Sequence, residues 1–306
     1  MARNQKIKVT IITGFLGAGK TTFINYLLKK YTDVEFALVE NEFGNAAIDT
    51  KLIKGVDASR MFELKEGCIC CTITDEYELV LQELAERFPN VMHLLIETTG
   101  VADPASVIRP FFRDEKLQEI YSFRGTICLV DTVNFDKETE KGLKQKQIAI
   151  SDFILINKSE KLTTAEKELL KMKINQLNPV CEIRFAEFGI SPYFNLENVT
   201  FQLKFYSIIP HEDTNHAKVI TKTLTFSSPL NKEKFSDWLS YTIDVYKNEI
   251  YRVKGILCFE NEPFEHILQG VGGSYEIMEG EKLVMGNKSQ IVVIGLLEGI
   301  DFEINF

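Results

Sequence analysis

The sequence contains no apolar run close to the roughly 18 residues that a membrane span needs, so no membrane association is expected. It also lacks an excess of positive charge, because 35 Lys and Arg stand against 44 Asp and Glu. A basic field is what attracts nucleic-acid phosphates, so nucleic-acid partners are not expected either. Residues 1–14 place charge before an apolar run but contain no signal-peptidase site, which indicates a first strand and not an export signal.

Cysteine is scarce except in one place. Six cysteines in 306 residues do not suggest a disulfide scaffold, and without a signal peptide a reducing cytoplasm is the expected compartment. Half of them, Cys68, Cys70 and Cys71, nevertheless fall within four positions. Clustered thiols in such a compartment more often bind metal or do redox chemistry, whereas Cys128 and Cys258, inside apolar runs, are expected to be ordinary buried residues.

Short apolar runs in the first part of the chain predict strands that are buried on both faces of a parallel sheet. They cover residues 8–13, 35–40, 93–97, 125–130 and 152–157. Between them lie amphipathic segments with the period of a helix, such as residues 20–30 and the segment that follows a capping box at Thr163 and Glu166. The alternation predicts an α/β fold with a doubly wound, mainly parallel sheet.

The segment GFLGAGKTT, residues 14–22, fits the phosphate-loop pattern G-x-x-x-x-G-K-[ST] between a predicted strand and a predicted helix. In such a loop the backbone N–H groups point at phosphate oxygens, and the helix start adds positive potential. We expect Lys20 to bridge the β- and γ-phosphates and Thr21 to ligate Mg²⁺. The predicted nucleotide contacts in this loop are Gly14, Gly17, Ala18, Gly19, Lys20, Thr21 and Thr22.

Two acidic residues are candidates for the Mg²⁺ side of this site. Glu97 ends a predicted strand, where its carboxylate can reach Mg²⁺ or the attacking water, or can merely cap the strand. Asp49 lies in the segment after the second predicted strand. We therefore take Lys20, Glu97 and Asp49 as candidate catalytic residues, and we expect slow hydrolysis because no arginine finger or dedicated general base is evident.

The segment Asn157-Lys158-Ser159-Glu160 ends another predicted strand and indicates which base is bound. GTPases commonly carry Asn-Lys-x-Asp at such a strand end, and the carboxylate accepts from the ring N–H and the amine of guanine. Adenine offers no such donor pair, and a buried carboxylate left unpaired would reject it. Glu160 is one methylene longer than Asp, so GTP is favoured and relaxed selectivity over ATP stays open.

The sequence predicts two domains. A P-loop GTPase domain is expected over residues 1–188, a linker with Pro192 and Pro210 over 189–216, and a smaller α+β domain over 217–306. In the last of these, strand patterns cover 219–226, 251–259, 264–278 and 290–297, and a helix pattern covers 232–246.

Together these residues resemble the CobW-type family of metal-handling P-loop GTPases, and most of all its YjiA-like branch. The segments that carry the resemblance are 14–22, 40–44, 67–71, 97–100, 157–158, 252–255, 269–271 and 293–295. The resemblance covers nearly the whole chain, and the Gly-Cys-x-Cys-Cys motif is its most specific part. Many members carry a His-rich loop, whereas this chain has only four His.

The resemblance implies a GTP-hydrolysing metallochaperone that binds zinc or cobalt at the Cys-x-Cys-Cys motif and delivers it to a client protein. Thiolates are soft ligands that suit Zn²⁺ and also accept Co²⁺. On an extended backbone Cys68 and Cys70 face one side and Cys71 the other, so a further ligand is needed, with Glu40 as the leading candidate. A turn would instead bring all three sulfurs together.

The expected mechanism is a metal switch gated by GTP. We expect the loop 41–49 to follow the second strand and the Cys motif to follow the third, both near the γ-phosphate. GTP and Mg²⁺ would order the loop, and hydrolysis to GDP would release it and loosen the metal. The alternatives are a small-molecule kinase, a structural zinc protein with a nucleotide docking switch, and a redox thiol pair. Neither the client nor the oligomeric state follows from the sequence.

Overall fold

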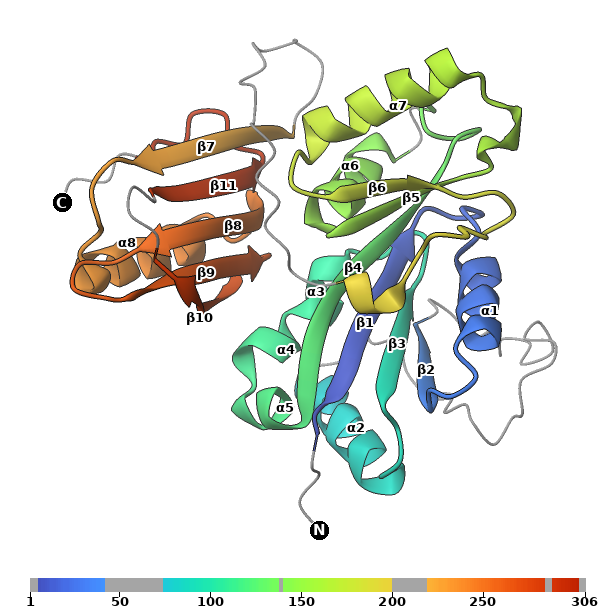
Figure 1. Cartoon of the computed structure of the whole chain (residues 1–306), viewed down its shortest axis with the longest axis horizontal. Coiled ribbons are helices and arrows are strands. Elements are labelled where there is room, and N and C mark those ends of the chain that lie inside the picture. The colour runs from blue at the N-terminus through green and yellow to red at the C-terminus, as the bar shows by residue number, and fades with distance from the viewer. Residues whose placement is uncertain (1–4, 42–73, 138–139, 200–218, 284–287, 303–306) are drawn as a thin grey trace. The chain divides into compact units, whose positions relative to one another are not determined.

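The computed structural model describes residues 5–41, 74–137, 140–199, 219–283 and 288–302 (Figure 1). The chain divides into two compact units, Met1–Lys171 with Cys181–Phe201 and Met172–Val180 with Gln202–Phe306. Within the described ranges, no helix has the length and apolar character that a membrane crossing requires. The predicted bounds of 1–188, 189–216 and 217–306 stay a prediction.

The first unit is built on a six-stranded sheet in which all neighbouring strands are parallel. In spatial order these are β2 (Phe36–Asn41), β3 (His93–Thr98), β1 (Ile7–Gly14), β4 (Tyr121–Asp131), β5 (Phe153–Asn157) and β6 (Glu182–Phe185). The predicted mainly parallel sheet is confirmed. Strand β6 escaped the apolar-run criterion because its EIRF sequence is charged and only partly buried at the sheet edge.

Helices cover both faces of this sheet. They are α1 (Lys20–Lys30), α2 (Thr74–Arg87), α3 (Pro104–Ile108), α4 (Pro110–Arg113), α5 (Glu115–Ile120), α6 (Lys141–Ile150) and the first part of α7 (Thr164–Leu177), whose residues from Met172 on belong to the second unit. Successive β4 residues show the two faces, since Ile127 and Leu129 join the core under α1, whereas Cys128 and Val130 line a pocket with Ile148 of α6, to which Leu129 also contributes. The predicted capping box at the start of α7 is confirmed, because Thr163 and Glu166 bond reciprocally.

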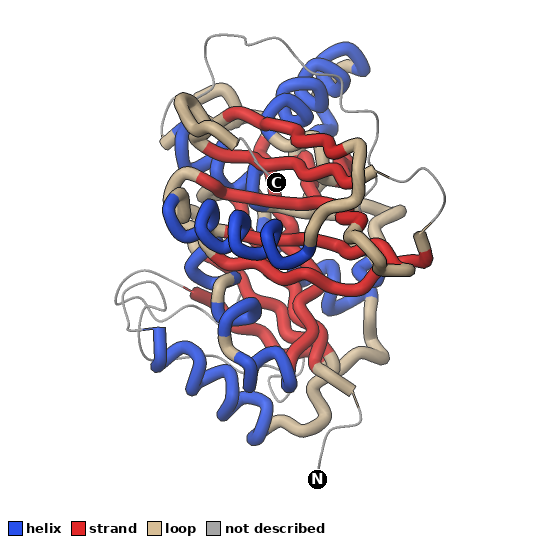
Figure 2. The backbone as a smooth tube through the Cα atoms, turned by 90° about the vertical axis from the view of Figure 1, so that its left-hand side faces the viewer, coloured by secondary structure: helices blue, strands red, loops and turns tan. Residues whose placement is uncertain are grey.

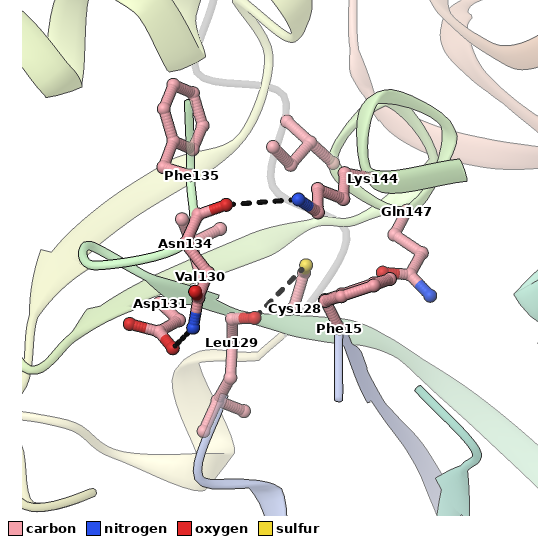
Figure 3. Close-up of a pocket in the computed structure, with 10 residues that line it drawn as sticks. Phe15, Cys128, Leu129, Val130, Asp131, Asn134, Phe135, Lys144 and Gln147 are labelled. Carbon is pink, nitrogen blue, oxygen red and sulfur yellow. Dashed lines mark hydrogen bonds between the residues drawn. The ribbon is translucent and has the colours of Figure 1, made fainter. Parts of the chain in front are cut away.

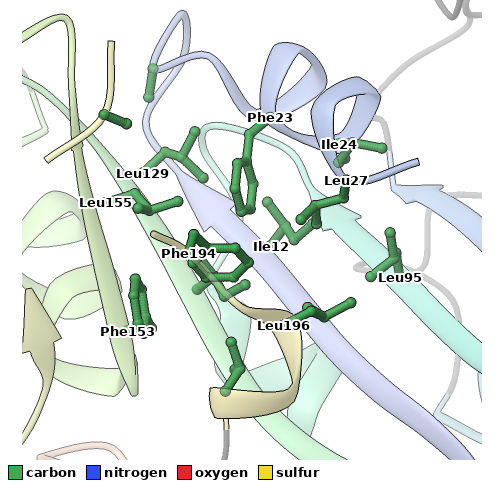
Figure 4. Close-up of a cluster of buried hydrophobic side chains, with 14 of the residues drawn as sticks. Ile12, Phe23, Ile24, Leu27, Leu95, Leu129, Phe153, Leu155, Phe194 and Leu196 are labelled. Carbon is green, nitrogen blue, oxygen red and sulfur yellow. The ribbon is translucent and has the colours of Figure 1, made fainter. Parts of the chain in front are cut away.

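The core under α1 is a cluster of aliphatic and aromatic side chains from the helix, the sheet and the segment after β6 (Figure 4). Phe23 of α1 and Phe153 of β5 both meet Phe194 edge-on, with ring centroids 5.2 and 5.1 Å from it. Edge-to-face pairs add about 0.5–1.5 kcal/mol to the burial of the rings. This cluster holds α1, and with it the phosphate loop, against the sheet.

The segment 189–199 is packed against α1, although it was expected to begin a linker. Phe194 is 1% exposed, and its carbonyl accepts from Lys30. Tyr31 accepts from the backbone N–H of Leu196 at 2.8 Å, and Tyr26 donates to the Ser191 carbonyl at 3.0 Å. Residues 189–199, called the strap below, therefore pack over α1. Apolar periodicity did not reveal this packing because the segment contains Pro and Asn and forms no long helix or strand.

The second unit is a five-stranded antiparallel sheet with α8 (Lys232–Val245) along one face (Figure 2). Its strands, in spatial order, are β10 (Ser274–Lys282), β9 (Phe264–Val271), β8 (Ile250–Cys258), β11 (Ser289–Gly295) and β7 (Ile220–Phe226). Phe235, Leu239 and Ile243 of α8 are buried with Val253 and Leu257 of β8. The α+β character expected for this part of the chain is thus observed.

One strand prediction in this unit was wrong. The apolar pattern over 264–278 suggested a single strand, but the chain folds back there as the β9–β10 hairpin. Gly272 and Gly273, at φ +51° and +85°, form the turn between Val271 and Ser274. Two consecutive residues with positive φ are what a two-residue hairpin turn requires, so the Gly-Gly pair was the signal to read.

His93 is a buried imidazole at the start of β3. Its Nε2 lies 2.9 Å from the Thr10 hydroxyl, and its ring packs on Phe36. Burial, together with the positive charges of Lys8 and Arg124, lowers the His93 pKa from 6.5 to about 3. The imidazole is therefore neutral in the folded protein at neutral pH, where it serves packing.

This pKa shift predicts acid sensitivity. Between pH 6.5 and pH 3 the unfolded chain binds a proton at His93 that the folded chain does not, so stability present above pH 6.5 is lost as the pH falls. Chemical denaturation at about pH 7 and about pH 4.5 should show wild type losing some 2–3 kcal/mol more than His93→Gln. Equal losses in the two proteins would contradict the assignment.

Two adjacent residues test the packed strap. Phe194→Ala should lower the free energy of unfolding by about 3–5 kcal/mol because it empties a site between two aromatic rings. Tyr193→Ala, at an 88% exposed neighbour, should change it by less than about 0.5 kcal/mol. Thermal or urea unfolding measures both, and a free linker would give two equally small effects.

Candidate functional site

The loop between β1 and α1 has the backbone conformation of a phosphate cradle. Gly14, Gly17 and Gly19 have φ of +136°, +76° and +100°, a region that favours glycine. A Cβ on Gly14 would collide with the Leu129 backbone of β4, and one on Gly19 would collide with the Asn157 amide. The glycine spacing of the motif therefore reflects both the turn itself and the closeness of β4 and β5.

Lys20 and Thr21 open helix α1 directly after this loop. The Lys20 ammonium group is buried and donates to the Gly14 carbonyl at 2.9 Å, and burial lowers its pKa although the nearby Glu97 carboxylate opposes the shift. The Thr21 hydroxyl donates to Glu97 Oε1 at 3.4 Å. The structure thus brings together the predicted phosphate lysine, the predicted Mg²⁺ ligand and the predicted acidic residue.

Asn157 ties the phosphate loop to two other segments. Its amide Nδ2 donates to the Ala18 carbonyl at 2.9 Å, and its Oδ1 accepts from the Gly189 N–H at 2.9 Å. Gly189 belongs to a tight turn in which Glu187 and Ile190 exchange two backbone hydrogen bonds. The sequence analysis assigned Gly189 no role at this site. The feature that could have indicated one is a glycine between two apolar residues.

Lys158, next in the chain, is held by a residue that the sequence analysis missed. Its ammonium group pairs with Asp131 at 2.8 Å, and its backbone adopts φ +61°. Burial opposes ionisation of Asp131, but the hydrogen bonds from Lys158, the Val133 N–H and Asn134 outweigh it and lower the Asp131 pKa. Asp131 lies at the end of a buried strand, as Glu97 does. That position in the sequence could have identified it as a candidate site residue.

The remaining predicted base and loop residues, Glu160 and Thr22, also follow the carboxyl ends of the parallel strands. Glu160 is exposed in a short 3₁₀ turn, Ser159–Lys161, which directly follows Lys158. Thr22 is exposed on α1 and lies next to Gly189. The Glu160 carboxylate is therefore exposed to solvent and accessible to a ligand.

The predicted metal-binding residues cannot be placed in the same way. Asp49, Cys68, Cys70 and Cys71 lie outside the described residues. Glu40 lies opposite Glu97 in the pairing of β2 with β3, so its backbone is at the correct edge of the sheet. Elsewhere in the chain, the described residues contain no group of three or more His, Cys, Asp or Glu suited to a metal.

The Cys motif was expected to follow the third strand of the sheet. The third described strand, β3, begins at His93, after the motif, so in chain order the motif lies between β2 and α2, in a segment outside the described residues. Among the described residues, Cys128, Cys181 and Cys258 form no disulfide. Cys128 and Cys258 are buried as predicted, and burial raises the Cys128 pKa to about 12.

A small pocket lies on the α6 side of β4 (Figure 3). Phe15 of the phosphate loop, Cys128 of β4 and Lys144 and Gln147 of α6 are among its lining residues. Lys144 donates to the Asn134 carbonyl at 3.0 Å, and its ammonium group lies 4.6 Å from the centre of the Phe15 ring. Helix α6 therefore reaches the phosphate loop from the face opposite to α1.

Comparison with known families gives two matches that together span most of the chain. Residues 8–185 match the model described as CobW/HypB/UreG, nucleotide-binding domain. Residues 219–303 match the Cobalamin synthesis protein cobW C-terminal domain. The first match contains every residue predicted for the nucleotide and the metal.

Among individual proteins, the zinc chaperone YjiA of Escherichia coli is 31% identical over 88% of this chain and 87% of its own length. The zinc-regulated GTPase metalloprotein activator 1 of Saccharomyces cerevisiae is 25% identical over 95% of this chain and 80% of its own. The crystal structure of Zn(II)-bound YjiA GTPase superposes with a TM-score of 0.70, at 24% identity, over 95% of this chain and 94% of that one. That structural likeness supports the fold.

The Asp131–Lys158 pair generates a prediction about nucleotide affinity. Asp131→Asn removes the charge that holds Lys158 and should weaken GDP binding about three- to tenfold, since a hydrogen bond to a charged group is lost. Glu182→Gln is the matched control, because it removes an ion pair with Arg184 on the exposed β6 edge. Titration with a fluorescent GDP analogue measures the affinity of both variants. An Asp131→Asn protein that binds GDP as tightly as wild type would contradict the role of Asp131.

Proposed function

The chain belongs to the CobW/HypB/UreG family, and on that premise we propose that it is a GTP-hydrolysing metallochaperone that binds zinc and delivers it to a client protein. The observation that carries the proposal is the assembly of Lys20, Thr21, Glu97 and Asn157 around one phosphate loop, in a chain that also contains a Cys-x-Cys-Cys motif. The related proteins named as zinc chaperones and GTPases support it.

In this proposal the nucleotide lies along the carboxyl edge of the parallel sheet. The N–H groups of the loop hold the phosphates, and Lys20, which now donates to the Gly14 carbonyl, turns to the β- and γ-phosphates. Asn157 keeps the loop in shape, whereas Lys158 and Glu160 contact the base. Guanine is the preferred base because Glu160 can accept from its ring N–H and its amine.

The oxygen donors at the γ-phosphate side fit Mg²⁺. A threonine hydroxyl and a carboxylate are hard ligands, and Thr21 and Glu97 already lie within hydrogen-bonding distance of each other. Thr21 would hold the ion, with Glu97 and Asp49 as further candidates. When bound, Mg²⁺ neutralises charge on the β- and γ-phosphates.

Zinc is the proposed cargo, held by Cys68, Cys70 and Cys71 with Glu40 as a further ligand, and cobalt is the second choice for the same thiolates. GTP would bring these ligands together, and hydrolysis to GDP would loosen them. Binding of zinc should therefore strengthen binding of a GTP analogue by the same factor as the analogue strengthens binding of zinc. The alternatives of a small-molecule kinase and a structural zinc protein gain no specific observation in their favour.

The test is zinc titration of the purified protein with Mg²⁺ and a non-hydrolysable GTP analogue, and again with GDP. Wild type should bind zinc more tightly with the analogue, by about five- to 150-fold. Cys70→Ala should weaken zinc binding by at least about 100-fold, because losing a direct ligand costs more than losing a supporting residue.

Cys181→Ala is the matched control, because it removes a thiol that lies outside the motif and forms no disulfide among the described residues, and it should leave zinc affinity unchanged. Equal zinc affinity with the GTP analogue and with GDP would remove the nucleotide gating. Unchanged zinc stoichiometry and affinity in Cys70→Ala would remove the metal site itself.

A further inference from the structure

Helix α6 is bonded to the loops on both sides of the phosphate loop. Lys144 donates to the carbonyls of Asn134 and Lys137, both at 3.0 Å, in the loop that follows Asp131. Less than one turn further along, Lys146 and Gln147 contact the segment after β3. One rigid helix therefore contacts the segment near the proposed base contacts and the segment near the proposed γ-phosphate.

Gln147 makes the most buried of these contacts. Its side chain is 1% exposed, and Nε2 donates to the Gly100 carbonyl at 3.2 Å and to the Ala102 carbonyl at 3.3 Å. Beside it, Lys146 pairs with Asp103 at 2.7 Å, and Asp103 in turn caps α3 by accepting from the Ala105 N–H. The chain from Gly100 to Asp103 is thus bonded to α6 at three points.

The same segment is pressed against the phosphate loop on its other side. A Cβ on Gly100 would collide with the backbone N of Leu16, so the two backbones touch. Three residues before Gly100, Glu97 accepts from Thr21 at 3.4 Å. The four residues Glu97–Gly100 therefore run from the start of α1 to the Gln147 amide. The first is hydrogen-bonded to Thr21 and the last to Gln147.

We propose that Gln147 is a positioning residue that holds the segment 97–100 against the phosphate loop, so that GTP hydrolysis and the preference for GTP over GDP depend on its amide. The two nucleotides differ only in the γ-phosphate, and Glu97 stands at the end of β3 beside Thr21, where that group would lie. If the segment is already held in place, GTP binds more tightly because no free energy is lost in ordering the segment on binding. The inference rests on the proposed GTPase function.

The alternative is a purely structural role for the two hydrogen bonds. In that case loss of the amide would lower stability and would weaken GTP and GDP binding alike. A positioning role instead changes the ratio of the two affinities and the turnover number while GDP binding is kept, because only GTP contacts the held segment.

The experiment uses Gln147→Met in the full-length chain, since methionine keeps the length of the side chain and removes the donor. The kcat and KM of GTP hydrolysis are measured with Mg²⁺, and the Kd values of GDP and of a non-hydrolysable GTP analogue are measured beside them. We expect kcat to fall about tenfold and the GTP-analogue to GDP affinity ratio to fall about fivefold, with GDP affinity within about twofold of wild type.

Gln118→Met is the matched control, because Gln118 donates to a single backbone carbonyl, that of Phe112, at 2.8 Å within the α4–α5 region. It should change neither kcat nor the affinity ratio. Lys146→Met removes the second tether at a partly exposed position and should lower kcat about two- to threefold, which keeps the proposal testable if Gln147→Met does not fold.

A folded Gln147→Met with wild-type kcat and an unchanged affinity ratio overturns the proposal, and so does an equal weakening of GTP and GDP. If Gln147→Met does not fold, wild-type kcat in Lys146→Met overturns it instead. A wild-type protein that does not hydrolyse GTP would contradict the proposed function. That outcome differs from one in which wild type hydrolyses GTP and Gln147→Met has the same kcat and affinity ratio, which contradicts only the role of Gln147.

Discussion

The candidate nucleotide site depends on the carboxamide of Asn157, which holds three separate parts of the chain at one point. Its two ends bond the Ala18 carbonyl in the phosphate loop and the Gly189 N–H in the turn after β6. The fit is so close that the loop residue beside it, Gly19, has no room for a Cβ. Because a buried amide that loses a partner is costly, these three segments keep one arrangement.

Around that point the first unit supports the phosphate loop from both faces of its sheet. On one face, Phe194 and the strap that contains it pack on α1 and leave that helix little freedom. On the other, α6 reaches the loop through Lys144 and the segment after β3 through Gln147. The two supports differ in kind, since one is an apolar cluster and the other consists of a cation–π contact and directed hydrogen bonds.

Much of this arrangement was predictable. The apolar runs located five of the six parallel strands, and the motif at 14–22 located the phosphate loop with its lysine and threonine. The prediction missed β6, whose edge position leaves charged side chains in contact with water, and it merged β9 and β10 across a Gly-Gly turn. Segment 189–199 looked like a linker because its proline and asparagines suit a loop, whereas the burial of Phe194, Leu196 and Val199 shows that it is packed.

Local sequence patterns established which chemical groups the protein carries and the order in which these groups follow buried strands. Apolar periodicity indicates which segments are buried, and glycine indicates where the backbone needs an unusual conformation. These patterns did not determine that Asp131 would hold Lys158, that Gln147 would hold Gly100, or that His93 would be buried and neutral. Those facts were decided by the tertiary structure. Each joins residues that are distant along the chain, and their distance apart depends on how helices and strands pack together, which no local pattern records.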